Sequence, residues 1–106
     1  MPGQLTEAEF SKNVNTKFRV RVNAPRPLEL ELVEVKGWVL QPKEQEGMER
    51  FSVFFYGPGD IYMPQSSYTL EHERMGVFDI FIVPVGRDER GYRYEAVFNY
   101  HKDGDE

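Results

Sequence analysis

The sequence contains no cysteine, which excludes disulfide bonds and thiolate metal sites. Its two histidines, His72 and His101, have no metal-ligating partner at a recognisable spacing. The acidic stretch at 103–106 lacks the longer spacing of a calcium loop. The glycine turns at 57–59 and 86–87 match neither the phosphate-loop nor the dinucleotide-binding spacing. We therefore expect packing alone to stabilise the fold, with no metal and no other cofactor.

Long apolar runs and an excess of positive charge are also missing. No run approaches the roughly 20 apolar residues of a membrane-spanning helix, and residues 1–4 do not begin a secretory signal. The chain has 13 Lys and Arg against 18 Asp and Glu, giving a net charge of −5 and a pI near 5.1. A nucleic-acid-binding domain usually carries a basic patch. We expect a cytoplasmic protein whose partners include no nucleic acid and no membrane.

Apolar and aromatic residues are present in sufficient number for one hydrophobic core. Of the 106 residues, 40% are hydrophobic and 14% are aromatic. Two separate cores would be too small to be useful at this length. We expect a single domain over residues 1–106, with frayed termini at 1–5 and 101–106.

A short helix is expected first. Thr6 and Glu9 have the spacing of a capping box, in which two side chains satisfy backbone N–H groups at a helix start. The asparagines of 13–15 favour a turn and should end the helix. A helix this short must dock on something larger, so we expect it over one end or one face of a sheet.

From Lys17 onward the apolar residues alternate with period two, which is typical of strands. Six strands are predicted, at 17–22, 28–40, 49–56, 67–72, 77–83 and 92–100. At 33–35 the apolar phase shifts by one residue, which indicates a β-bulge or a change of face. The short polar connections leave no room for crossover helices. The predicted fold is an all-β antiparallel meander, forming a barrel or compact sandwich of about six strands with a short N-terminal helix.

The segment 11–26 carries five basic residues and no acid. It is either a phosphate-binding face or a strand that its neighbour neutralises, and we favour the second interpretation. A hairpin with a five-residue loop would satisfy both faces at once. Its pairs would be Val20 with Leu30, Arg19 with Glu31, and Arg21 with Glu29.

Catalysis has little support in the sequence. The serines at 52, 66 and 67 have no nucleophile-elbow context and no evident base. Two carboxylates lying close together would be expected by chance among 18 acids, so they do not indicate acid–base chemistry. We expect a protein that is not an enzyme.

Apolar side chains in a loop and on outward strand positions form the candidate interaction surface. The loop around the turn at 57–60 is rich in side chains that lose their hydration easily, a composition common at recognition surfaces. The same loop could instead plug one end of a barrel. Outward strand positions also carry large apolar groups, including Val83 and Val97, which solvent-facing positions rarely do without cover. The candidate residues are Phe54, Tyr56, Ile61, Tyr62, Met63 and Phe81.

Six blocks of the chain are distinctive in combination: 5–10 (LTEAEF), 30–35 (LELVEV), 51–58 (FSVFFYGP), 67–72 (SYTLEH), 81–88 (FIVPVGRD) and 94–99 (YEAVFN). Together they resemble a family of small bacterial all-β domains of unknown function. The resemblance covers nearly the whole chain and implies no catalytic residues. It implies an association with phage-tail-like collar or fibre proteins, and with it a structural or assembly role.

Three functions remain open at this point. The first is a non-enzymatic interaction or assembly module that binds a protein partner or forms a homo-oligomer. The second is a small-ligand-binding β-barrel, with Trp38 and the tyrosines lining a pocket. The third is an enzyme without a recognisable motif. A filled barrel interior would favour the first, and an internal pocket the second.

Overall fold

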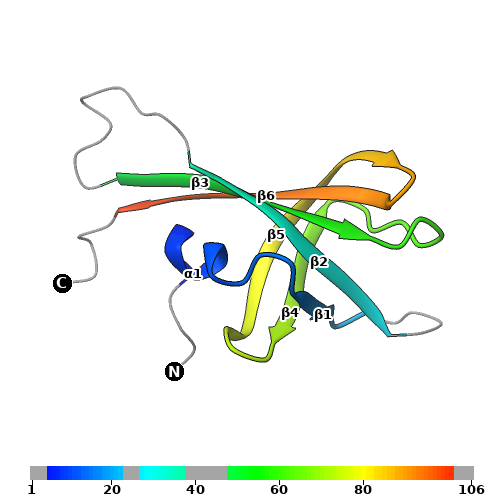
Figure 1. Ribbon diagram of the computed structural model, residues 1–106, viewed down its shortest axis with the longest axis horizontal. Coiled ribbons are helices and arrows are strands. Elements are labelled where there is room, and N and C mark those ends of the chain that lie inside the picture. Colours follow the sequence, from blue (N-terminus) through cyan, green and yellow to red (C-terminus); the bar gives the residue numbers. More distant parts are fainter. Residues whose placement is uncertain (1–4, 23–26, 38–47, 102–106) are drawn as a thin grey trace.

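The computed structural model describes residues 5–22, 27–37 and 48–101 (Figure 1). Its elements are α1 (Glu7–Ser11), β1 (Lys17–Val20), β2 (Leu28–Gly37), β3 (Met48–Gly57), β4 (Ser66–His72), β5 (Gly76–Asp88) and β6 (Gly91–His101). All strand pairs are antiparallel. The predicted fold class, an all-β antiparallel structure of six strands with a short N-terminal helix, is confirmed.

The order of the strands differs from the predicted meander. The six strands close into a barrel in the order β1-β2-β3-β6-β5-β4. β3 therefore pairs with β6 and not with β4, over ten residue pairs from Met48–His101 to Gly57–Tyr92. With β2 on its other edge, β3 is paired on both sides, so it has the central position that its apolar sequence favours. Two three-stranded meanders, β1-β2-β3 and β4-β5-β6, are thus joined along β3 and β6.

The register predicted between the first two strands is wrong by two residues. Phe18 pairs with Leu30 and Val20 with Leu28, so Arg19 lies opposite Glu29 and Lys17 opposite Glu31. A shift of two leaves every side chain on its expected face, so the alternation cannot distinguish the two registers. The pairing of β1 with β4 on its other edge accounts for the observed register, since Val20 also pairs with Leu70 of β4 and closes the barrel there.

Two strand irregularities set the direction of the outward side chains. The bulge expected at 33–35 is confirmed, because the β2–β3 register shifts between Leu32 and Glu34. The strand predicted at 77–83 is longer than expected, since β5 continues to Asp88 with a second shift between Pro84 and Gly86. The extra residue in each case bends the strand without ending its pairing.

Helix α1 closes one end of the barrel and inserts Phe10 into the core. The Thr6 hydroxyl accepts the Glu9 backbone N–H at 3.1 Å, which confirms the Thr6 half of the predicted capping box, while the Glu9 carboxylate pairs with Lys12. The helix was expected over one end or one face of the sheet, and Phe10 is fully buried among inward-facing rings. Leu5, expected to be frayed, also packs against this core.

Aromatic rings occupy the middle of the barrel. The Phe10 ring lies 5.3 Å from that of Phe98 and 6.0 Å from that of Phe51, measured between centroids. Phe18 and Phe78 pack on the same ring, at 6.3 and 6.1 Å. Alternate residues of the last two strands face the core, as the period-two pattern predicts: Phe78, Ile80 and Ile82 in β5, and Tyr94 and Ala96 in β6.

Some sequence expectations fall outside the described residues. Trp38, which the ligand-binding hypothesis placed in a pocket, is among them, as are Leu40 and both chain ends at 1–4 and 102–106. His101, expected to fray, belongs to β6. In the part of the chain that the structure describes, no helix is long and apolar enough to cross a membrane.

Candidate interaction surface

The outward side of β3, β6 and β5, called the outer face below, carries two rows of paired residues. Phe54 pairs with Glu95, and Glu95 pairs with Val83. One step along the sheet, Tyr56 pairs with Arg93. These residues alternate with the buried Phe55, Tyr94 and Ile82, and therefore point away from the core. Figure 1 shows β3 and β6 side by side along most of their length.

Arg93 packs against two aromatic rings at one end of the outer face. Its guanidinium carbon lies 4.6 Å from the centre of the Phe54 ring and 5.6 Å from that of Tyr56. An Nη2–H of Arg93 donates to Glu34 Oε1 at 2.9 Å. Burial alone would lower the pKa of Arg93, but its contacts with Tyr56 and Glu34 outweigh this and raise the pKa. The stacked cation is therefore held in one orientation.

Tyr56 links this stack to the β5–β6 turn. Its hydroxyl donates to Asp88 Oδ2 at 2.5 Å, and the guanidinium of Arg90 lies 4.3 Å from the centre of its ring. The Tyr56 hydrogen bond and the Arg90 backbone N–H both favour the charged carboxylate and lower the pKa of Asp88. The same Arg90 guanidinium forms an ion pair with Glu31 at 3.6 Å. The result is a chain of contacts that orders side chains from β2, β3 and the turn.

The other end of the outer face is apolar and exposed. Phe81 is 52% exposed and Val97 is 58% exposed. Each lies two residues beyond the Val83–Glu95 pair, on the same side of its strand. Neither side chain contributes to the core, and large apolar groups this exposed in the middle of long strands are typical of interaction sites.

The six candidate residues do not form one surface. Phe54, Tyr56 and Phe81 share the outer face, while the loop residues lie elsewhere. Met63 is 3% exposed and its N–H donates to the Tyr94 hydroxyl at 3.0 Å, so it plugs the barrel end, and its place on the candidate surface is corrected.

Of the other two loop residues, Ile61 is half-buried against the core, while Tyr62 is 55% exposed. The Tyr62 ring packs edge-on to Tyr92 at 5.3 Å. Part of the loop therefore belongs to the core because it closes a hydrophobic interior that would otherwise open to water.

Two hollows lie against outward side chains of the described residues. One, of about 320 Å³, is bordered by charged and aromatic side chains, including Lys17, Glu31, Tyr56 and Arg90. The other, of about 360 Å³, lies beside β1 and β4. The barrel interior is occupied by the aromatic core, so neither hollow is the internal pocket of a ligand-binding barrel.

Sequence reasoning missed the three charged residues that order the outer face, Arg93, Arg90 and Asp88. They lie 32 to 37 positions after Tyr56 and meet it only through the β3–β6 register and the β5–β6 turn. A single sequence gives no signal of that register. Among the residues that the structure describes, no group of three or more metal-ligating side chains is placed to hold a metal ion.

Comparison with known proteins assigns the chain to a family. Residues 5–98 match the family model of a domain of unknown function, DUF6916. The match spans nearly all of the described strands, and the chain belongs to this family. No curated protein and no solved structure shows significant similarity to it.

Proposed function

We propose that this member of the DUF6916 family is a non-enzymatic interaction module that associates through the outer face. The observation that carries the proposal is the exposure of Phe81 and Val97 on long, paired strands. Burying these two side chains against another surface would remove their apolar area from water, at about 25 cal/mol per Å².

The stacked end of the same face supports this function. Tyr, Phe and Arg are enriched in the central contacts of protein interfaces. Arg93 and Arg90 are held on the rings of Phe54 and Tyr56 in the free chain. A side chain that is already ordered loses less conformational entropy when a partner covers it.

The proposed occupant of the outer face is a second copy of this chain. A two-fold contact uses the same patch on both copies, and such dimers are the commonest closed assemblies. The face offers opposite charges within its own stack, with Arg93 bonded to Glu34 and Arg90 paired with Glu31. Two such faces can meet with their charges already neutralised, which lowers the cost of burying them.

Sedimentation velocity at tens of micromolar tests the proposal. The wild type should sediment as a dimer, and Phe81→Glu should sediment as a monomer because it would bury a charge in the contact. Tyr62→Glu is the matched control, since Tyr62 is equally exposed but lies at the barrel end. A monomeric wild type, or equal dissociation of both variants, contradicts the proposal. Far-UV circular dichroism checks that each variant is folded.

The proposed setting is an assembly role in the bacterial cytoplasm, beside phage-tail-like collar or fibre proteins. Support comes from the six sequence blocks that resemble the family, and from the exposed Tyr62 at the barrel end, which a dimer on the outer face leaves free. A pull-down from the host with the wild type and Tyr62→Ala tests it. Recovery of collar or fibre proteins by the wild type alone is the expected result, and their absence from the wild-type sample contradicts the setting.

A further inference from the structure

His72 lies at the end of β4, where it joins the β4–β5 turn to the chain that leads out of α1. Its Nδ1 accepts the backbone N–H of Arg74 at 3.0 Å and that of Met75 at 3.2 Å. Its Nε2 lies 2.8 Å from the hydroxyl oxygen of Thr16. The imidazole is buried and packs on the Phe18 ring, with centroids 4.2 Å apart.

These contacts fix the position of the proton on the ring. Because Nδ1 accepts two N–H groups, it carries no hydrogen, and the proton of the neutral imidazole is on Nε2. Nε2–H then donates to Thr16, whose own hydroxyl donates to the Asn13 carbonyl at 2.6 Å. This tautomer leaves no basic nitrogen toward Thr16, so the pair is structural and does not activate the hydroxyl.

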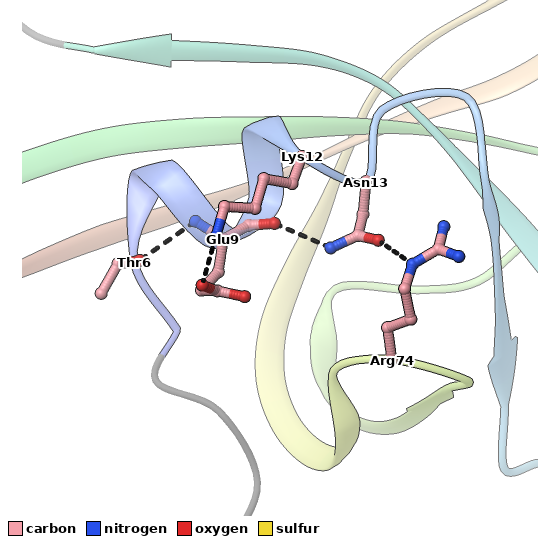
Figure 2. Close-up of polar contacts among 5 residues, drawn as sticks. All are labelled: Thr6, Glu9, Lys12, Asn13 and Arg74. Atoms are coloured by element: carbon pink, nitrogen blue, oxygen red, sulfur yellow. Dashed lines mark hydrogen bonds and ion pairs between the residues drawn. The ribbon is translucent and has the colours of Figure 1, made fainter.

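A second connection runs parallel to the first. Asn13 Nδ2 donates to the Glu9 carbonyl of α1 at 2.8 Å, and Asn13 Oδ1 accepts from Arg74 Nε at 2.9 Å (Figure 2). Figure 2 shows the side chains of Asn13 and Arg74 pointing toward one another across the space between the helix and the turn. The turn at 73–75 therefore holds α1 in place, and α1 in turn holds Phe10 in the core.

We infer that His72 and Asn13, with the turn they bind, form an acid-sensitive latch that keeps α1 docked. A proton added to Nδ1 would point an N–H at the two backbone N–H groups that Nδ1 now accepts. Both hydrogen bonds would be lost and the turn would have to rearrange, since three donors cannot share the site. Arg74 moves with the turn, so its bond to Asn13 would be lost as well. Acid would then free the turn and loosen α1 while the sheet stays intact.

Neighbouring charges do not offset this effect. Charged groups from three strands and the turn lie around the imidazole, three basic and three acidic: Lys17, Arg19, Arg74, Glu29, Glu71 and Glu73. Arg19 is opposed by Glu29 and Glu71 in the strand registers. The surroundings therefore supply no net negative charge that would stabilise an imidazolium.

The direction of the pH effect follows from the folded pKa. Burial, and then Arg74, lower the pKa of His72 below its ordinary value of 6.5, although Glu73 opposes them. The opened form, with its solvated imidazole, binds the proton at higher pH than the latched form. The latch is therefore fully formed above about pH 6.5, and it weakens as the pH falls below that value.

Amide hydrogen exchange followed by NMR tests the latch. After correction for intrinsic exchange, the amides of Arg74 and Met75 should lose protection as the pH falls from about 6.5 to 5, by up to about tenfold per pH unit. The amides of Phe10 and Lys12, bonded within α1, should follow them. Val53, in the centre of β3, should keep its protection because its strand pairs do not depend on the turn.

His72→Asn is the matched control. The asparagine side-chain oxygen can accept the N–H two residues later, as in an Asx turn, but it does not titrate. Its turn and helix amides should show no loss of protection over the same pH range. Equal acid sensitivity in this variant would assign the effect to carboxylates and overturn the latch. Unchanged protection of Arg74 and Met75 in the wild type, or a parallel loss at Val53, would overturn it as well.

Discussion

Tyr56 is the residue on which the ordered end of the outer face depends. Its ring packs against Arg90 and Arg93, and its hydroxyl donates to Asp88. One side chain thus joins β3 to β6 and to the turn between β5 and β6. The position was predicted to be outward from the alternation of 51–56, but its three partners could not be predicted, since each depends on a register that long-range pairing sets.

Replacing Tyr56 with Phe should raise the pKa of Asp88 toward its ordinary value of 3.8. The Tyr56 hydrogen bond is the largest of the causes that lower this pKa, and its loss removes a donor to the charged carboxylate. Carboxyl-carbon NMR titration measures the shift. Tyr68→Phe, which removes a hydroxyl bonded to the Pro64 carbonyl instead, should leave Asp88 unchanged. An unaltered Asp88 titration in Tyr56→Phe would assign the effect to the Arg90 amide.

Phe10 has a different role, because it stabilises the whole core from a helix of five residues. Phe10→Ala should reduce the free energy of unfolding by about 3–5 kcal/mol, since it leaves a cavity among aromatic rings. Urea denaturation measures the loss. Ala8, exposed on the same helix, provides the control: Ala8→Ser should change the stability by less than about 0.5 kcal/mol. Similar losses in both variants would mean that helix propensity, and not core packing, determines the effect.

At the level of elements, the sequence indicates well which face of a strand is buried, and poorly which strand it pairs with and in which register. The capped helix, the bulge after Leu32 and the inward sides of β5 and β6 were all predicted, because each follows from spacing within a short segment. The β1–β2 register was missed by two residues, since both registers bury the same side chains. The extension of β5 to Asp88 was missed because residues 84–88 contain proline and glycine, which usually end a strand.

The contact between the end of β3 and the β5–β6 turn requires glycine at position 91. Gly91 has a φ of 133°, and a Cβ there would lie 2.0 Å from the Gly57 carbonyl oxygen. Gly91→Ala should lower the free energy of unfolding by roughly 2–4 kcal/mol, through backbone strain and this clash. Thermal or urea denaturation measures it.

Gly86 supplies the matched comparison, because a Cβ there would meet no atom within 4 Å. Gly86→Ala should change the stability by less than about 1 kcal/mol. If both variants were equally destabilised, the close approach of the turn to Gly57 would not be the cause.

At the level of the whole molecule, closure of the barrel determines which surfaces remain. A meander would have left β3 next to β4, and β4 would have separated Phe54 of β3 from Phe81 of β5. The observed order places β6 between β3 and β5, so Glu95 lies between Phe54 and Val83 in one outward row, and Phe81 follows two residues along β5, where that strand pairs with β4. The sequence predicted that Phe54, Tyr56 and Phe81 point outward. It could not show that Met63 turns inward, because loop residues lack the regular alternation that indicates which side chains face the core.

Closure of the barrel also determines which acidic residues neutralise the basic segment around β1. Arg19 lies between Glu29 of β2 and Glu71 of β4, and Arg21 pairs with Glu71. Lys17 lies opposite Glu31. The positive charge of β1 is therefore balanced from both neighbouring strands, where the sequence alone suggested only one.

With β1 balanced in this way and a net charge of −5, we expect no nucleic-acid binding tighter than about 10⁻⁴ M at physiological salt. Fluorescence anisotropy with labelled duplex and single-stranded oligonucleotides measures it. The double variant E29Q/E71Q removes the acids that flank Arg19 and should bind more strongly than the wild type at low salt, because the released cations can then contact phosphates. Micromolar, salt-sensitive binding by the wild type would contradict this expectation, and it would mean that the arginines of β1 remain available despite their acidic neighbours.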